Sequence, residues 1–262
     1  MADERLAAAF NGHGRHAALM PYLMGGFPSL SGSLEVGRAY ADFADLVEVG
    51  VPFSDPLADG PAIQAAGQRA LEAGATLERV LGEVAAPLAE EVPVVLMCYA
   101  NQLIARGFER VTEMLAANGV SGLIVPDMPA AEAQELRAAC DAAGIALVPL
   151  VAPTTPPDEV RRIAAAARGF VYVVSVTGVT GERTTLPPEL QEVVKQVRDA
   201  AEVPVAVGFG VGTPEQAAEV GQVADGVIIG SRLVRAVGEA DSLEDGLADV
   251  RAFLTDTVRA LS

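Results

Sequence analysis

Two carboxylates close together in the chain have the clearest potential for catalysis. Glu48 lies inside the apolar run Leu46 to Pro52, and Asp59 follows in a loop that contains proline and glycine. An ionised glutamate buried in such a run costs on the order of several kcal/mol unless it is paired. Burial would therefore raise the pKa of Glu48 and fit it for proton exchange near neutral pH. A structural Glu48 bonded to an arginine or the backbone, and a turn role for Asp59, are the alternatives.

The sequence lacks suitable residues for Schiff-base catalysis by a lysine and for a metal site with histidine ligands. The only lysine, Lys195, lies in the helical segment Leu190 to Ala200, where a Schiff-base lysine is not expected. The only histidines, His13 and His16, precede the first apolar run and have no further metal ligands at suitable spacing. We therefore expect no metal and no organic cofactor, and acid–base work falls to carboxylates and tyrosine.

Further polar and glycine-rich positions follow later apolar runs. Asp127 ends the run Gly122 to Met128, where it can either face the same site or cap the next helix. Glycine-rich turns follow the last three runs, at Thr177 to Gly181, Gly208 to Gly212 and Gly230-Ser231. Backbone N–H groups at such turns favour an anion, so the turns indicate a phosphate-bearing ligand.

The elements that must position these residues form a regular series. Eight short runs are almost continuously apolar, as in strands buried on both faces, and helical segments separate them. The count of eight favours a (β/α)8 TIM barrel of the α/β class, in which active sites lie at the C-terminal ends of the strands. The first run ends in Met24 to Pro28, which lacks the glycine pattern of a doubly wound dinucleotide-binding sheet. The runs are Ala18 to Gly25, Leu46 to Pro52, Val92 to Tyr99, Gly122 to Met128, Ala146 to Pro153, Phe170 to Val176, Val203 to Gly210 and Gly226 to Ser231.

Some segments exceed the basic barrel plan. We expect an extra helix near the N-terminus (Glu4 to Asn11), another between Phe53 and Thr76, and a short one after the eighth strand (Arg232 to Val237). No linker or change of composition divides the chain, so residues 1–262 are expected to form one domain. Thr155 and Thr213 are expected to begin helices, and Gly119 and Gly144 to end them. Two of these helices are expected at Pro129 to Ala143 and Pro156 to Ala167.

The composition excludes several classes of partner. The formal net charge is −17, which disfavours nucleic acid and anionic membranes. No apolar stretch approaches the ~20 residues of a transmembrane helix. The N-terminus lacks the apolar core of a signal peptide, and Cys98 and Cys140 are expected to be buried thiols. We therefore expect a soluble cytoplasmic protein.

One long segment resembles a known family. Leu46 to Gln64, LVEVGVPFSDPLADGPAIQ, closely resembles the signature of tryptophan synthase alpha subunits. Met24 and Ser121 depart from the family pattern. These departures affect the expected shape of the substrate pocket and not the acid–base pair. Further matching segments are Met97 to Asn101, Gly122 to Pro129, Ser175 to Gly181, Val207 to Val211 and Gly226 to Ser231.

The resemblance implies roles for the matching positions. Glu48 corresponds to the general acid–base glutamate and Asp59 to the aspartate that acts on the indole nitrogen. Tyr172 corresponds to an active-site tyrosine, whereas Tyr22 and Tyr99 correspond to aromatic positions lining the indole pocket. For all three tyrosines, core packing is the alternative. The phosphate cradle corresponds to Gly181, Gly210, Gly230 and Ser231, and Thr180 to the threonine of a closing loop.

The same resemblance implies an activity and a partner. The expected reaction is retro-aldol cleavage of indole-3-glycerol phosphate to indole and glyceraldehyde 3-phosphate in L-tryptophan biosynthesis. The expected assembly is an alpha2beta2 heterotetramer with a pyridoxal-phosphate beta subunit, which receives indole directly. Pro52, Phe53 and Asp55 are expected near that interface, and the loops 53–60 and 177–185 are expected to be mobile lids.

Three other functions fit parts of the same pattern. A free-standing indole-3-glycerol phosphate lyase would use the same residues without a partner. A different sugar-phosphate barrel enzyme would need another acid–base set. A catalytically silent phosphate-binding barrel could serve as an allosteric scaffold, although the presence of both carboxylates argues against it.

Overall fold

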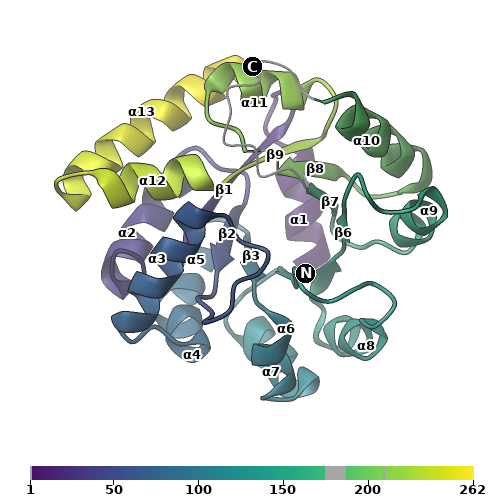
Figure 1. The fold of residues 1–262 in the computed structure, drawn as a ribbon, viewed down its shortest axis with the longest axis horizontal. Coiled ribbons are helices and arrows are strands. Elements are labelled where there is room, and N and C mark those ends of the chain that lie inside the picture. The colour runs from purple at the N-terminus through teal and green to yellow at the C-terminus, as the bar shows by residue number, and fades with distance from the viewer. Residues whose placement is uncertain (1, 175–186, 209) are drawn as a thin grey trace.

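The strands form a single parallel barrel, which places the ends of all of them around one mouth. The computed structural model describes residues 2–174, 187–208 and 210–262. Its strands follow the order β5-β4-β3-β2-β1-β9-β8-β7-β6, and every pairing is parallel (Figure 1). They are β1 (Ala18–Met24), β2 (Val47–Gly50), β3 (Val94–Met97), β4 (Gly122–Ile124), β5 (Ala146–Val148), β6 (Leu150–Val151), β7 (Val171–Val174), β8 (Val205–Gly208) and β9 (Gly226–Ile229).

The fifth predicted strand is divided at Pro149. Its first part, β5, pairs with β4, and its second part, β6, pairs with β7. Proline has no N–H to donate to a ladder, but the carbonyl of Pro149 accepts a 3.0 Å hydrogen bond from the Tyr172 N–H. The eight predicted runs therefore give nine strands, and the predicted (β/α)8 barrel is confirmed.

Helices surround the barrel, and the three predicted extra helices are present. Helix α1 precedes β1, α3 follows β2, and α12 follows β9 (Figure 1). The bounds are α1 (Ala2–Asn11), α2 (Leu30–Ala41), α3 (Pro61–Glu72), α4 (Leu77–Val80), the π-helical turn η1 (Leu81–Ala85), α5 (Ala86–Ala89), α6 (Ala100–Ile104), α7 (Phe108–Ala117), α8 (Gln134–Ala143), α9 (Pro157–Ala165), α10 (Pro188–Ala200), α11 (Pro214–Gly221), α12 (Ser231–Glu239) and α13 (Leu243–Leu261).

Helix ends follow local chemistry in some places and not in others. Thr213 caps α11 in a full capping box, and Gly144 ends α8 with a left-handed φ of 73°. The prediction for Thr155 is wrong, because Pro156 precedes α9 and the Thr155 hydroxyl accepts from the Ala152 N–H instead. Helix α8 begins at Gln134 and not at Pro129, since residues 129–132 form a turn closed by a 2.9 Å backbone hydrogen bond.

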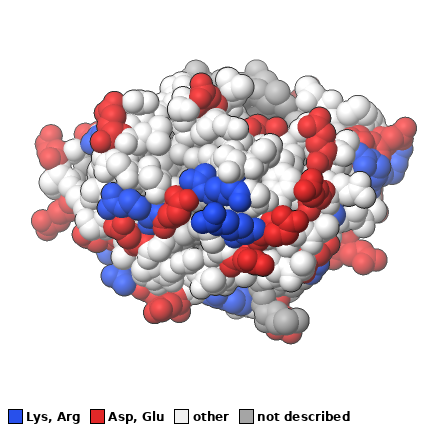
Figure 2. Space-filling model, turned by 90° about the horizontal axis from the view of Figure 1, so that it is seen from below, with Lys and Arg blue, Asp and Glu red and all other residues white. Residues whose placement is uncertain are grey.

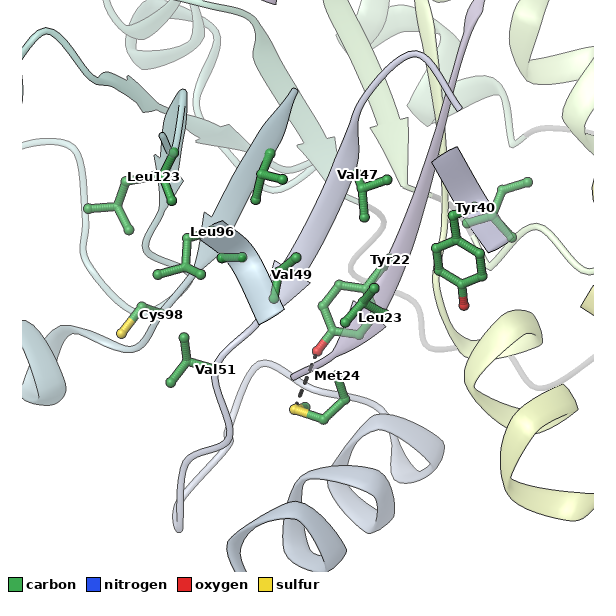
Figure 3. Packing of buried hydrophobic residues seen from close by; sticks show 14 of the residues in the cluster. Tyr22, Leu23, Met24, Tyr40, Val47, Val49, Val51, Leu96, Cys98 and Leu123 are labelled. Carbon is green, nitrogen blue, oxygen red and sulfur yellow. Dashed lines mark hydrogen bonds between the residues drawn. The ribbon is translucent and has the colours of Figure 1, made fainter. Parts of the chain in front are cut away.

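The apolar residues form an inner and an outer layer. The inner layer fills the barrel with residues such as Met20, Val95, Ile124 and Phe170. The outer layer joins the sheet to the helices, and Figure 3 shows Val47 and Val49 on β2 followed by Val51 just beyond its end. Side chains alternate between the two layers along each strand, so every second strand residue can face the barrel axis. Both cysteines, Cys98 and Cys140, are buried free thiols as predicted.

The N-terminal face of the barrel is closed by α1 and by two aspartates. Leu6 and Phe10 of α1 belong to the inner layer and cover this end. Asp45, just before β2, accepts from the Leu19 N–H at 2.7 Å and pairs with Arg15. Asp225, just before β9, makes the same kind of contacts. Its carboxylate accepts from the Val205 N–H and from the Arg198 guanidinium, each at 2.9 Å. This face is therefore built for stability, which leaves the opposite face for function.

The surface carries the acidic excess in a mixed pattern. On the face seen in Figure 2, basic side chains stand beside acidic ones and form no broad basic region. Among residues 2–174, 187–208 and 210–262, no helix has the length and apolar character of a membrane span.

Candidate active site

Glu48 is buried inside the barrel. It lies on the inward side of β2, two residues after Leu46 of the inner layer, and its register neighbour on β1 is Tyr22. The residue is 1% exposed, and neither carboxylate oxygen has a hydrogen-bond partner among the described residues. Among residues 2–174, 187–208 and 210–262, no arginine or backbone group satisfies Glu48 in the way that the structural alternative requires.

The surroundings of Glu48 favour its neutral form. Burial raises the pKa of Glu48 to about 8, and the negative charge of Asp59 adds to that rise. A carboxyl with this pKa is mostly protonated at neutral pH, yet it can lose its proton at small cost. Glu48 can thus both donate and accept a proton under physiological conditions.

Asp59 lies on the loop between β2 and α3 and is held by Tyr99. Burial raises the pKa of Asp59 to about 6, and a hydrogen bond with the Tyr99 hydroxyl opposes that rise. The same hydroxyl accepts from the Ala58 N–H at 3.1 Å, and the Tyr99 ring stacks on Phe53 at 5.0 Å between centroids. Asp59 is therefore mostly ionised at neutral pH while Glu48 is mostly neutral.

Tyr22 and Tyr172 complete the group inside the barrel. Both are buried, and burial is the main reason that their pKa values are raised, with the charges of Glu48 and Asp59 adding to it. Each ring lies over a strand glycine, since a Cβ on Gly50 would collide with the Tyr22 hydroxyl and one on Gly208 with the Tyr172 hydroxyl. The Tyr22 hydroxyl points to the Met24 sulfur at 4.0 Å (Figure 3).

Two glutamines that the sequence did not single out fix the β2–α3 loop. Gln64 Nε2 donates to the carbonyl oxygen of Asp59 at 2.9 Å, and Gln102 Nε2 of α6 donates to that of Pro52 at 2.9 Å. Gln64 is the last residue of the segment Leu46 to Gln64, which resembles the family signature. Gln102 is distant in sequence, and only the folded chain brings it to this loop. The loop that carries Asp59 is thus tied to α3 and α6 as well as to Tyr99.

Asp127 caps a helix, but not the helix that follows it in the chain. Its Oδ1 accepts from the Ala100 N–H at 2.8 Å, at the start of α6. It therefore caps the helix after β3 and not the helix that follows it in the chain. This bond ties the loop after β4 to the loop after β3 at the rim of the barrel mouth.

The candidate phosphate-binding positions lie across the mouth from β4. Gly210 follows β8 with a φ of 52°, and Gly230 and Ser231 begin α12. An added Cβ on Gly230 would lie 3.6 Å from Ile63 and 3.7 Å from Tyr22, so this turn borders the aromatic group. The start of α12 thus presents N–H groups near Tyr22, the register neighbour of Glu48. Thr180 and Gly181 lie outside the described residues.

The lysine and the histidine that the sequence analysis excluded from catalysis lie away from Glu48, Asp59 and the tyrosines. Lys195 is exposed on α10, on the outside of the barrel. His13 precedes β1, where its Nδ1 accepts from the Arg15 N–H at 3.0 Å. The barrel mouth therefore brings together two carboxylates with separated pKa values, three tyrosines and a glycine-lined helix start.

This arrangement agrees with the relatives of the chain. A family model described as tryptophan synthase alpha chain matches residues 9–261. The chain belongs to the tryptophan synthase alpha chain family. The tryptophan synthase alpha chain of Carboxydothermus hydrogenoformans is 48% identical over 222 residues, which cover 84% of this chain and 83% of that protein. The alpha chain of a Synechococcus species is 46% identical over 93% of this chain and 91% of that protein.

Solved structures of tryptophan synthases share the fold. An open form of tryptophan synthase from M. tuberculosis matches with a TM-score of 0.87 at 34% identity, over 98% of each chain. Tryptophan synthase subunit alpha from Legionella pneumophila matches with a TM-score of 0.87 at 31% identity, over 99% of this chain and 97% of that one. Membership of the family identifies the chain as a lyase of tryptophan biosynthesis.

Proposed function

We propose that the chain cleaves indole-3-glycerol phosphate to indole and glyceraldehyde 3-phosphate, as one barrel domain. The observation that carries the proposal is Glu48, a buried carboxyl whose two oxygens have no hydrogen-bond partner in the described part of the chain and whose pKa is raised by burial and by the charge of Asp59. Two carboxylates whose pKa values are pushed apart are the usual sign of separate acid–base roles.

In the proposed reaction, Glu48 moves a proton twice. Its carboxyl first protonates C3 of the indole, which makes an indolenine with positive charge at the ring nitrogen. The Glu48 carboxylate then takes the proton of the side-chain hydroxyl next to C3. The C–O bond becomes a carbonyl, the C–C bond breaks, and its electron pair restores the indole ring. Glu48 is protonated again at the end, so the protons balance.

Asp59 and the tyrosines support these steps. The Asp59 carboxylate stabilises the positive charge that develops at the ring nitrogen. Tyr22, Tyr99 and Tyr172 form aromatic and polar walls for the ring, and Tyr172 stands on the strand opposite Glu48. At the other end, Gly210, Gly230 and Ser231 hold the phosphate through N–H groups and the Ser231 hydroxyl, together with Gly181 by resemblance. Thr180, also by resemblance, belongs to the loop that closes over the site.

Indole release from indole-3-glycerol phosphate tests the proposal. Glu48→Gln and Asp59→Asn are each expected to lose at least about 100-fold in kcat, in the range of removed general acid–base groups. Glu35→Gln, on the exposed side of α2, is the control and should keep its rate. Circular dichroism shows whether each variant is folded. Folded Glu48→Gln with near-normal turnover would rule out the assigned role.

The partner proposed for this chain is a tryptophan synthase beta subunit in an alpha2beta2 assembly. Leu57 is 93% exposed and Ile104 is 60% exposed, and they are the large hydrophobic side chains that stand out to solvent in the described part of the chain. Leu57 lies on the β2–α3 loop and Ile104 ends α6, which the Gln102–Pro52 bond joins to that loop. An apolar surface that includes the loop of Asp59 would link docking to catalysis.

The same assay separates the partner from its alternatives. Indole release is expected to rise when a beta subunit is added, and Leu57→Asp should weaken that rise more than it changes the rate of the isolated chain. A rate that no beta subunit alters would instead indicate a free-standing lyase. Binding of the substrate without any indole release would indicate a silent scaffold.

A further inference from the structure

A second space lies beside the catalytic group, at the C-terminal ends of β4 and β5. This cavity has a volume of about 310 Å³ and extends under the loop after β4 to helix α8. Its walls are mainly apolar, and Asp127 and Arg137 are its charged members. An engineered apolar cavity of about 150 Å³ is known to bind benzene, so this space is large enough for a ring or a substituent.

The cavity crosses the wall of the barrel. Val148, which lines it, belongs to the inner layer, and Leu150, also in the lining, packs against that layer. Leu136 and Leu147 line it as well and belong to the outer layer. The crossing point is Pro149, where the fifth strand divides and its two parts pair with different neighbours. A continuous strand would close this gap with a hydrogen-bond ladder, but the division leaves space between the end of β4 and β6.

The cavity lies beside Tyr172 and on the side of the barrel mouth opposite the Gly230 turn. Leu150 is the register neighbour of Tyr172, so the cavity begins beside an aromatic wall of the site. Around the barrel, β1, β2 and β3 separate β4 from β9 on one side, and the divided fifth strand, β7 and β8 separate them on the other. A ligand whose phosphate lies at the Gly230 turn after β9 therefore points its far end toward the cavity.

The geometry points to a substrate range wider than the unsubstituted compound. The cavity extends the ring pocket through the barrel wall, so that the enzyme accepts indole-3-glycerol phosphates with an apolar substituent, such as methyl or bromine, on the six-membered ring. Carbons 5 and 6 of that ring are the farthest from the glycerol side chain and would direct a substituent into the gap. This inference rests on the proposed function, because it assumes that the ring lies at the β4 side of the mouth.

Ala133 offers a way to fill the cavity without removing a hydrogen bond. It is 6% exposed, lines the cavity and precedes α8 without a side-chain cap bond. Leucine is as poor a capping residue as alanine, so Ala133→Leu changes volume rather than capping. Ala139, 7% exposed on the same helix but outside the cavity, gives the matched control Ala139→Leu.

The experiment compares kcat/KM for 6-bromoindole-3-glycerol phosphate with that for the parent compound in three proteins. The wild type should cleave both compounds. The ratio of the two kcat/KM values should fall about tenfold or more in Ala133→Leu, the usual effect of a small change in pocket volume, and stay unchanged in Ala139→Leu. A wild type that cleaves only the parent compound, or an equal ratio in both variants, overturns the inference.

A binding measurement separates this inference from the proposed function. The chain contains no tryptophan, so the fluorescence of added 6-methylindole reports that ligand against a weak background. If the parent compound releases no indole, the proposed function fails. The cavity then stands if Ala133→Leu weakens 6-methylindole binding more than Ala139→Leu does, and it falls if the two variants bind equally.

Discussion

At the scale of single residues, the ionisation of Glu48 and Asp59 determines when the site can work. In the proposed mechanism, cleavage needs a protonated Glu48, with a pKa of about 8, and an ionised Asp59, with a pKa of about 6. The profile of kcat/KM against pH should therefore rise through about 6 and fall through about 8. In Tyr99→Phe, Asp59 loses a hydrogen bond that lowers its pKa, so the acidic limb should move to higher pH. If the acidic limb of the profile does not move in Tyr99→Phe, the ionisation of Asp59 does not cause that limb.

Glu48 also links stability to pH. Its pKa rises from an ordinary 4.5 to about 8 on folding, so the folded state prefers the protonated form. The stability it contributes is complete below pH 4.5 and is lost as pH rises through 8. Relative to Glu48→Gln, the wild type should lose roughly 3 kcal/mol of unfolding free energy between pH 4 and pH 7. Urea unfolding of both proteins at the two pH values measures the change, and a constant difference would contradict the raised pKa.

The acid–base pair could be predicted from the sequence, but its supports could not. Glu48 is conspicuous because a charged residue interrupts an apolar run, and the segment around it resembles a family signature. Gln102 carries no such signal, because its bond to Pro52 depends on how α6 meets the loop. Phe53 lies in the signature-like segment, but its stacking on Tyr99 depends on how the end of β3 meets the loop. The actual partner of Asp127, the start of α6, likewise depends on neighbouring strands that are distant in sequence.

At the scale of elements, the start of α12 is the part that should hold the phosphate. Ser231→Ala removes one hydroxyl next to the N–H groups of this helix and should raise KM about fivefold, the effect of one hydrogen bond, with little change in kcat. Ser242 provides a control, because its hydroxyl caps α13 by accepting from the Asp245 N–H at 3.1 Å. Ser242→Ala should cost about 1 kcal/mol of stability and leave KM unchanged. Equal KM values in Ser231→Ala and the wild type would remove Ser231 from the site.

Elements were predictable where one local rule decides them. Apolar runs gave the strands, and glycine and threonine gave the ends of α8 and α11. The division of the fifth strand was not predicted, because Pro149 lies within an apolar run and only the barrel closure shows that its two sides need different neighbours. The start of α8 was placed too early, since proline is common at helix starts and also in the turn that occurs here.

At the scale of the whole molecule, the N-terminal face should carry stability and not activity. Asp45 and Arg15 are 13% and 14% exposed in their side chains, and Asp45 also accepts the Leu19 N–H. Asp45→Ala leaves a buried cation and a strand N–H unsatisfied, and should cost about 3 kcal/mol of unfolding free energy. Asp256→Ala, which breaks an exposed pair with Arg259, should cost less than about 0.5 kcal/mol. If both variants lose similar unfolding free energy, the buried contacts of Asp45 stabilise the fold no more than the exposed pair of Asp256 and Arg259 does.

The order of strands in the sheet also sets an order of assembly. Strands β1 to β5 pair only with neighbours that follow one another in the chain, apart from the seam between β1 and β9. That seam joins the two ends of the sequence, so it carries the largest loop-closure entropy and should form last. During synthesis the first half can thus gain its ladder before the second half exists. Pulse-labelling hydrogen exchange should find amides of β3 and β4 protected before those of β9.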